Sequence, residues 1–324
     1  MDPKTIKQSA AASLADASYD VKKLALIHTG VIVLFSLLGA FANQLLDSGM
    51  QSAGGLSGIG MRTFLQSGQV ILSLLNMVLL PFWQVGFLYS AIRYSRREPV
   101  APSSLLEGFR RVGPVFRLNL LLSLLFGGVM MACSYISTAI FMFSPFSDNF
   151  FTAMDSLFAS SNPSAITDEM FFALLPSMTW LFVIFGILLL VIGLPMYYRY
   201  RMSEFALMDG APGALAAMRE SVQITRMHRM DLFRFDLSFW WYYGTLFLLS
   251  IVAFGDSILS ALGLKLPIGA GVQYWLFYGV YLIAQLVFSW RFAGYYQTSY
   301  AQCYAMLKHY ASPLSQKKPE LQEQ

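Results

Sequence analysis

Long apolar stretches alternate with short polar connections along the whole chain. A helix needs about 20 mainly apolar residues to cross a bilayer, and six stretches satisfy this requirement. Pro81, Pro176 and Pro195 fall inside two of them, which membrane helices tolerate when neighbouring groups satisfy the freed backbone. The pattern predicts an all-α, polytopic membrane helix bundle of six transmembrane helices, at residues 24–46, 66–92, 116–143, 172–198, 233–255 and 272–294.

The composition agrees with this membrane pattern. Of the 324 residues, 56% are hydrophobic and only 12% are charged, whereas a soluble domain carries about 25% charged residues. Phe, Tyr and Trp make up 15% of the chain, and many of them stand at the ends of apolar stretches, as in an interfacial aromatic belt. We therefore expect a membrane-embedded protein.

Basic residues fix the expected orientation. Of the 22 lysines and arginines, 20 precede the first span, follow or close the last one, or lie in the second and fourth connections or within two residues of them. Only Arg62 and Lys265 lie in the other connections. Because basic residues stay on the cytoplasmic side, both termini are expected in the cytoplasm. Residues 1–23 lack the apolar core of a signal peptide, so the first span is expected to act as an uncleaved signal.

The cytoplasmic connections resemble one another and indicate a threefold internal repeat. Each begins with a small-residue segment, and each of the apolar spans that follow is headed by a basic residue. We predict one integral membrane domain over 1–312, made of units 1–100, 101–210 and 211–312, with a disordered tail at 313–324. The segments are AAASLADASYD at Ala10, APSSLLEGFRR at Ala101 and APGALAAMRES at Ala211, followed by Lys23, Arg117 and Arg234.

Each predicted unit is a cytoplasmic amphipathic helix followed by a two-span hairpin. In residues 213–230 the apolar positions Leu215, Met218, Val222 and Ile224 fall roughly on one side. Such a helix can lie in the headgroup plane of an anionic leaflet. It can equally pack against the cytoplasmic ends of the bundle, and the sequence leaves both interpretations open.

The fifth predicted span has an acid deep in its apolar stretch. In DLFRFDLSFWWYYGTLFLLS, which starts at residue 231, Asp236 is followed by a run of apolar and aromatic residues. A carboxylate at that depth is unfavourable unless it is paired or hydrated. We predict a polar cavity or ion-pair cluster of Asp236 with Arg199, Arg201 and Arg291. The alternative is an interfacial acid that only fixes helix packing.

Basic and aromatic residues at the cytoplasmic span ends are the candidates for lipid contact. A long basic side chain there can extend to the headgroups, and Trp is typical of the interface. The expected partners are membrane lipids, with anionic ones favoured, and a membrane protein is a further candidate partner. The residues concerned are Lys23, Arg117, Arg234, Trp240 and Trp241.

The sequence contains no recognisable catalytic or cofactor motif. There is no HExxH, no phosphate-binding GxxxxGK[ST] and no GxSxG, and the three histidines and two cysteines form no metal-ligand spacing. We interpret Cys133 and Cys303 as buried apolar thiols. The prediction is a protein without enzymatic activity, resident cofactor, metal or nucleic-acid partner.

The segment FRFDLSFWWYYGTLFLL resembles the F-x-L-x-LSF-x-x-W signature of a bacterial family of multi-pass membrane proteins whose common domain has no assigned function. Phe235 replaces the more usual leucine, and the tryptophan falls one or two positions early. The resemblance covers the last third of the chain, and it implies a six-span fold in a bacterial cytoplasmic membrane without implying an activity. The chain is also distantly similar to the membrane domain attached to some glycerophosphodiester phosphodiesterases. The signature positions are Phe233, Phe235, Leu237, Ser238, Phe239, Trp240 and Trp241.

Three functional classes remain open from the sequence. The first is a non-enzymatic accessory protein that binds lipid or a membrane partner. The second is a transporter or lipid translocator with an inner-leaflet polar cavity. The third is an intramembrane enzyme, for which no catalytic set is recognisable.

Overall fold

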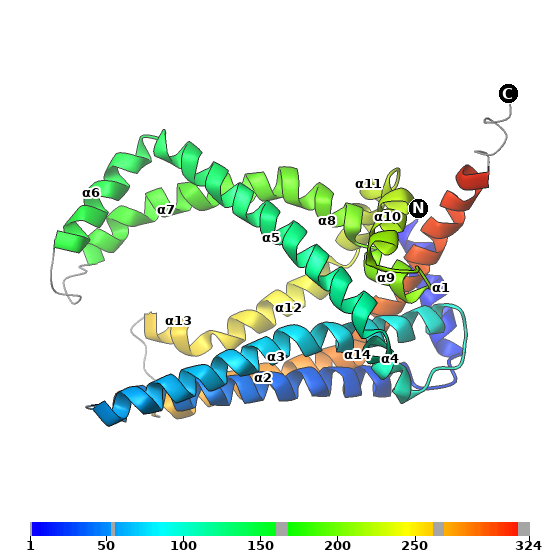
Figure 1. Cartoon of the computed structure of the whole chain (residues 1–324), viewed down its shortest axis with the longest axis horizontal. Coiled ribbons are helices and arrows are strands. Elements are labelled where there is room, and N and C mark those ends of the chain that lie inside the picture. The colour runs from blue at the N-terminus through cyan, green and yellow to red at the C-terminus, as the bar shows by residue number, and fades with distance from the viewer. Residues whose placement is uncertain (1, 53–55, 160–167, 262–268, 317–324) are drawn as a thin grey trace. The chain divides into compact units, whose positions relative to one another are not determined.

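The chain is helical in all the regular elements that the structure describes. The structure is a computed structural model, and it describes residues 2–52, 56–159, 168–261 and 269–316 (Figure 1). The elements in chain order are α1 (Pro3–Ala15), α2 (Val21–Ser52), α3 (Leu56–Ser95), η1 (Pro102–Leu106), α4 (Glu107–Arg110), α5 (Val112–Met142), α6 (Phe146–Ala159), α7 (Asp168–Leu188), η3 (Leu189–Gly193), α8 (Leu194–Tyr200), α9 (Ser203–Met208), α10 (Ala214–Thr225), α11 (Arg229–Leu237), α12 (Trp240–Ala253), α13 (Gly255–Ala261) and α14 (Ala270–Gln316).

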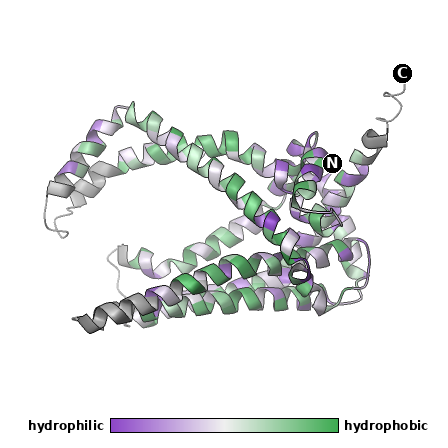
Figure 2. Cartoon of the chain, viewed as in Figure 1, coloured by the Kyte–Doolittle hydropathy of each residue, from purple (hydrophilic) through white to green (hydrophobic). Residues whose placement is uncertain are grey.

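Five of the six predicted spans are confirmed as helical segments that are long and apolar enough to cross a membrane. A sixth is present only if the bent pair α11 and α12 counts as one span. Figure 2 shows the long hydrophobic stretches along α2, α3 and α5. Among the described residues the five are Val21–Leu45, Gln66–Ser95, Val112–Met142, Leu175–Met208 and Gly271–Ala311.

Large apolar side chains remain exposed along these helices. Leu34 is 55% exposed on α2, Leu124 is 65% exposed on α5 and Phe182 is 66% exposed on α7. A water-soluble protein rarely exposes extended apolar surfaces of this kind, whereas lipid chains cover them without penalty. The exposure is therefore that of a membrane-embedded protein.

The chain divides into two compact units. One comprises Met1–Leu118 with Met202–Gln324, and the other comprises Asn119–Arg201. In the first unit α2, α3 and α14 pack against one another, and α12 packs on α14. In the second unit α6 packs on α7, where the Ser177 hydroxyl donates to the Phe146 carbonyl at 3.0 Å. The predicted single domain over 1–312 joins both units.

The short polar elements of the first unit pack against the ends of its long helices. The element pair η1 and α4 contacts α3, α10 contacts α9, and α1 contacts α14. A buried cluster lies where α2, α3 and η1 meet, and its members are Leu24, Ala25, Phe87, Tyr94, Val100 and Leu105. We call α1, η1, α4, α9 and α10 together the collar.

Two glycines allow α3 to contact the collar backbone directly. A Cβ atom on Gly86 would lie 1.9 Å from the Leu105 carbonyl oxygen, and one on Gly108 would lie 2.0 Å from the Phe82 carbonyl oxygen. Beside this contact the hydroxyls of Ser90 and Ser104 are 2.6 Å apart and buried. The glycines therefore set the spacing between α3 and the η1–α4 segment.

The fifth predicted span is not one straight helix. It is broken between Leu237 and Trp240, and the axes of α11 and α12 differ by 58°. The Lys7 ammonium of α1 donates to the freed Ser238 carbonyl at 2.7 Å and lies 3.8 Å from the centre of the Phe239 ring. No proline or glycine stands at the break, so the sequence pattern alone predicted a continuous helix.

The fourth predicted span changes its helical winding near its end. Residues 189–193 form the π-helical turn η3, and Pro195 follows at the start of α8. A proline in a helix has no N–H to donate, and its ring clashes with the carbonyl four residues earlier. A local widening of the helix relieves that clash.

The buried face of α10 differs from the predicted one. Ile224 of the predicted side is buried, but Leu215 is 59% exposed, and the small residues Ala214, Ala217 and Ser221 are buried instead. Small side chains let α10 lie close to α9 and α14, and they carry little hydrophobic signal in the sequence. Of the two interpretations left open, the structure favours packing on the bundle.

The three segments of the predicted repeat begin at different places relative to their helices. Ala10 lies inside α1, whereas Ala101 and Ala211 precede their helices, so the three segments do not occupy equivalent helical positions. At the other end α14 continues to Gln316. Residues 317–324 of the predicted tail lie outside the described residues.

Candidate functional site

The four residues of the predicted polar cluster belong to different units. Asp236 and Arg291 are in the first unit, and Arg199 and Arg201 are in the second. In that second unit the Arg201 guanidinium lies 5.0 Å from the Tyr197 ring. The four-membered cluster therefore stays a prediction. Within the first unit, Asp236 and Arg291 lie in different surroundings.

Asp236 is half-buried on α11 and contacts phenol groups. The Tyr243 hydroxyl donates to its carboxylate at 3.3 Å, and the Tyr296 hydroxyl lies 2.6 Å from that of Tyr243. The Tyr242 and Tyr296 rings are stacked, with centroids 4.4 Å apart. The acid thus lies beside the break between α11 and α12, at one end of an aromatic contact between α12 and α14.

Arg291 lines a groove between the α1–α2 connection and α14. The groove has a volume of about 460 Å³, and we call it the α1–α2 groove. Arg291 and Trp290 are exposed there, and the Lys22 ammonium lies 5.9 Å from the Trp290 ring. The lining residues are Ala11, Leu14, Ala15, Ala17, Tyr19, Asp20, Val21, Lys22, Trp290, Arg291, Gly294 and Tyr295.

The local sequence explains the shape and charge of the α1–α2 groove. A Cβ atom on Gly294 would lie 2.4 Å from a methyl carbon of Val21, so glycine permits the close approach of α14 to α2. The Asp20 carboxylate accepts from the Lys22 backbone N–H at 2.9 Å, at the start of α2. With Lys22 and Arg291 cationic and Asp20 anionic, the lining charges favour an anion.

The residues predicted to contact lipid lie in different surroundings. Lys23, Arg117 and Arg234 are exposed, and Trp240 is 70% exposed. Trp241 instead packs edge-on against Phe292 of α14, with ring centroids 5.0 Å apart.

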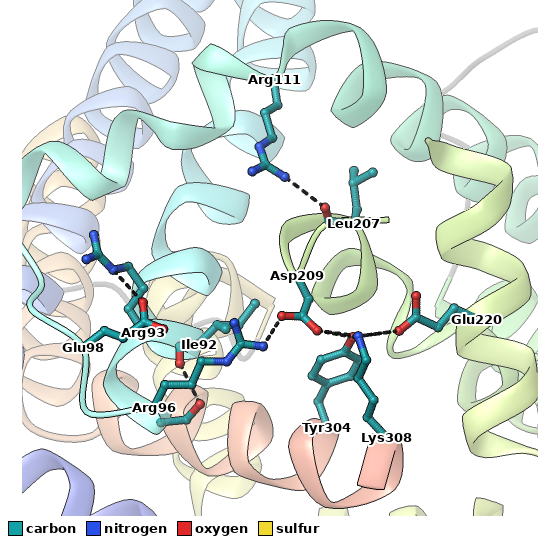
Figure 3. A network of polar contacts seen from close by, with 11 residues as sticks. Ile92, Arg93, Arg96, Glu98, Arg111, Leu207, Asp209, Glu220, Tyr304 and Lys308 are labelled. Carbon is teal, nitrogen blue, oxygen red and sulfur yellow. Dashed lines mark hydrogen bonds and ion pairs between the residues drawn. The ribbon is translucent and has the colours of Figure 1, made fainter. Parts of the chain in front are cut away.

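A buried acid that the sequence analysis did not single out is Asp209, which follows α9. Its side chain is only 4% exposed, and its carboxylate contacts the cations of Arg96 and Lys308, the latter at 2.6 Å (Figure 3). The Tyr304 hydroxyl lies 3.0 Å from both the Asp209 and the Glu220 carboxylates. The network joins the ends of α3 and α14 to α9 and α10.

Two opposing effects act on the pKa of Asp209. Burial raises it, but the hydrogen bonds and charges of Lys308 and Arg96 more than offset this and leave the pKa below its ordinary value. Asp209 is therefore ionised at neutral pH. The one local signal in the sequence was the Asp209–Gly210 turn, where Gly210 has φ of 111°. The partner Lys308 is 99 residues away in sequence.

Two further findings concern metal binding and the similarity of the chain to known proteins. Within the described ranges no group of three or more His, Cys, Asp and Glu side chains is placed to hold a metal ion. Comparison of the chain with protein-family models, curated proteins and solved structures finds no match. The resemblance carried by Phe233 to Trp241 accordingly stays an expectation.

Proposed function

We propose that the chain is a non-enzymatic protein of a bacterial cytoplasmic membrane that binds an anionic phospholipid at its inner face. The observation that carries this proposal is the α1–α2 groove, in which Lys22 and Arg291 accompany Trp290. On the orientation inferred from the basic residues, this groove opens at the level of the inner-leaflet headgroups.

The chemistry of the groove suits a phosphodiester attached to lipid chains. An arginine can bind phosphate oxygens through two parallel hydrogen bonds, and a lysine adds a point charge. Trp290 and Tyr295 provide the amphipathic rings that are typical of the headgroup level. Arg291 makes no ion pair among the described residues, so its charge is available to a ligand.

The collar supports a protein built from three repeated units. Each of three junctions made by the collar contains a serine: the first joins η1 to α3, the second joins α10 to the start of α9, and the third joins α1 to α14. Ser104 lies against Ser90, Ser221 accepts from the Met202 N–H at 3.2 Å, and Ser13 accepts from the Gln302 amide at 3.0 Å. Because α1 packs on α14, the third junction joins the two ends of the chain. On this proposal the three junctions correspond to one another, although Ser221 stands ten residues after Ala211 whereas Ser13 and Ser104 stand three residues after Ala10 and Ala101.

Native mass spectrometry of the purified protein with equimolar phosphatidylglycerol and phosphatidylcholine tests the lipid proposal. The wild type should retain one phosphatidylglycerol in preference to phosphatidylcholine. The double variant Lys22→Gln with Arg291→Gln should lose this preference, with its affinity for phosphatidylglycerol lowered by at least about 100-fold. Each lost charge-assisted hydrogen bond is worth about 1.5–3 kcal/mol, and 1.4 kcal/mol corresponds to a factor of ten.

The matched control removes two exposed positive charges outside the groove. Lys4→Gln with Arg219→Gln makes the same change in net charge at two exposed positions, and neither residue lines the groove. This variant should bind phosphatidylglycerol as the wild type does. Equal loss in both double variants would show a nonspecific charge effect, and retention in the groove variant would refute the site.

Translocation of lipid or solute is a second candidate function, favoured by the broken fifth span. Discontinuous helices near polar groups are typical of transporter sites, and Asp236 lies at such a break. Vesicles containing the protein should then equilibrate a fluorescent phospholipid between leaflets faster than protein-free vesicles, and Asp236→Asn should slow this exchange. Exchange at the protein-free rate would remove this candidate.

A further inference from the structure

Helix α11 has an exposed apolar face with helical spacing. Met227, just before the helix, is 81% exposed, and Met230, Phe233 and Leu237 are 66%, 37% and 58% exposed. We call these four residues the α11 stripe. The opposite side of the helix is buried, with Leu232 and Phe235 each 1% exposed. The hydrophobic side chains of α11 are thus divided between the protein core and an outward face.

The bend between α11 and α12 limits how far α11 extends from the bilayer. Its 9 residues have a length of about 13 Å at 1.5 Å per residue. At 58° to α12, the component of that length along the α12 axis is about 7 Å, which is close to the thickness of one headgroup layer. With α12 along the membrane normal, the whole of α11 stays within that layer.

Arginines accompany the α11 stripe. Arg226 and Arg234 are exposed and Arg229 is half-buried, and none of the three pairs with a carboxylate in the described part of the chain. The neighbouring acid Asp231 lies 3.0 Å from His228. An apolar face flanked by cations that lack carboxylate partners matches an anionic leaflet, in which acyl chains lie below the phosphates.

We propose that α11 is an interfacial helix whose exposed stripe inserts into the inner leaflet while Arg226, Arg229 and Arg234 bind anionic headgroups. The sequence pattern left an interfacial role open for residues 213–230, but α10 packs on α9 and α14. The interfacial role is therefore assigned to α11 and not to α10. This inference involves no residue of the α1–α2 groove and does not depend on it. It also explains why charged residues begin the fifth span, since that stretch lies along the surface before the chain turns inward at α12.

Spin labels on the full-length protein in nanodiscs test the proposal. A nitroxide at Met230→Cys should collide more with lipid-soluble oxygen and less with a water-soluble nickel chelate than one at Glu98→Cys, an exposed position of the collar-side loop after α3. A label at Val287→Cys, which is 55% exposed on α14, gives the lipid-facing reference. Wild-type protein gives the labelling background, because Cys133 and Cys303 are buried.

Lipid composition and charge separate this proposal from its alternatives. In nanodiscs containing phosphatidylglycerol, Arg226→Gln with Arg234→Gln should reduce the inserted population relative to the non-inserted one by about 25-fold, or about fivefold per arginine. In phosphatidylcholine the same variant should behave as the unmodified sequence does. The proposal is overturned if position 230 is as accessible to nickel as position 98 in both lipids. Spin–spin broadening between copies would instead assign the stripe to self-association, and would also overturn it.

The groove variant keeps the two proposals distinguishable. Lys22→Gln with Arg291→Gln should leave the accessibility of the label at position 230 unchanged. Conversely, the arginine variant of α11 should leave the single phosphatidylglycerol in the groove.

Discussion

Replacing Gly86 by alanine tests the close packing of α3 against the collar. The added Cβ atom would lie 1.9 Å from the Leu105 carbonyl oxygen, and Cβ atoms essentially never approach such an atom within 3.0 Å. The two backbones must therefore separate by at least 1.1 Å, the difference between 3.0 and 1.9 Å. Neither atom belongs to a flexible side chain that could move aside. Overpacking of this kind lowers the free energy of unfolding by about 1–3 kcal/mol.

Gly30→Ala is the matched control for this substitution. Gly30 is also inside a long helix, but a Cβ atom there would meet nothing within 4 Å. Alanine stabilises a helix interior by about 0.5–1 kcal/mol relative to glycine. The two identical chemical changes should therefore shift stability in opposite directions.

A thiol-reactive fluorescent dye in detergent can measure both variants, because Cys133 and Cys303 are buried and react only on unfolding. At about 2–4 °C per kcal/mol, Gly86→Ala should melt several degrees below the wild type, and Gly30→Ala should melt at or above it. If Gly86→Ala melted as high as Gly30→Ala, the close contact with Leu105 would be wrong.

Two further substitutions test the polar contacts. Asp209→Asn should lower the free energy of unfolding by about 2 kcal/mol, because it leaves two cations without their shared carboxylate. The control Asp16→Asn removes a carboxylate from an exposed ion pair and should change the free energy of unfolding by less than about 1 kcal/mol. The folded pKa of Asp209 is below its ordinary value, so the stabilisation that its carboxylate provides is present above about pH 4 and is lost as the pH falls through the folded pKa. Melting curves from pH 3 to 7 should therefore show the wild type losing more stability than Asp209→Asn. Parallel curves would contradict this assignment. Lys7→Met should lower the melting temperature and increase hydrogen exchange at the break between α11 and α12, because it removes the donor to the Ser238 carbonyl. Lys4→Met, at an exposed position of the same helix, should leave both unchanged, and equal effects would refute a specific role for Lys7.

The sequence predicted the long helices because each of them depends on a local property, the apolar character of about 20 consecutive residues. The break at Ser238 was not predictable in this way. No proline or glycine marks it, and the group that satisfies its carbonyl is Lys7, which is 231 residues away in sequence. A hydropathy pattern carries no information about such a distant partner.

The same reasoning applies to the candidate sites. Arg291 was identified as a candidate partner of Asp236, but its groove is formed with the α1–α2 connection, which only the fold brings near. Asp209 was missed because counting charges by side of the membrane does not show which charges meet. The predicted α10 side was only partly right, with Ile224 buried and Leu215 exposed, because small residues make many of the contacts: Ala214 and Ala217 are buried but contribute little to an apolar pattern.

The contact between α1 and α14 explains why Lys7 contacts a residue that is far away in sequence. In the collar, η1 with α4 packs on α3, which precedes them in the chain, and α10 packs on α9 and on α14. Helix α1 packs chiefly on α14, which is far from it in sequence, and it also contacts α3. Through this position α1 lies beside both ends of the last proposed unit: Ser13 accepts from Gln302 of α14, and Lys7 reaches the break before α12. On the proposed repeat, α1 takes the place beside α14 that a further collar element would occupy, and the bend between α11 and α12 is held by Lys7, a residue of the first repeat unit (1–100).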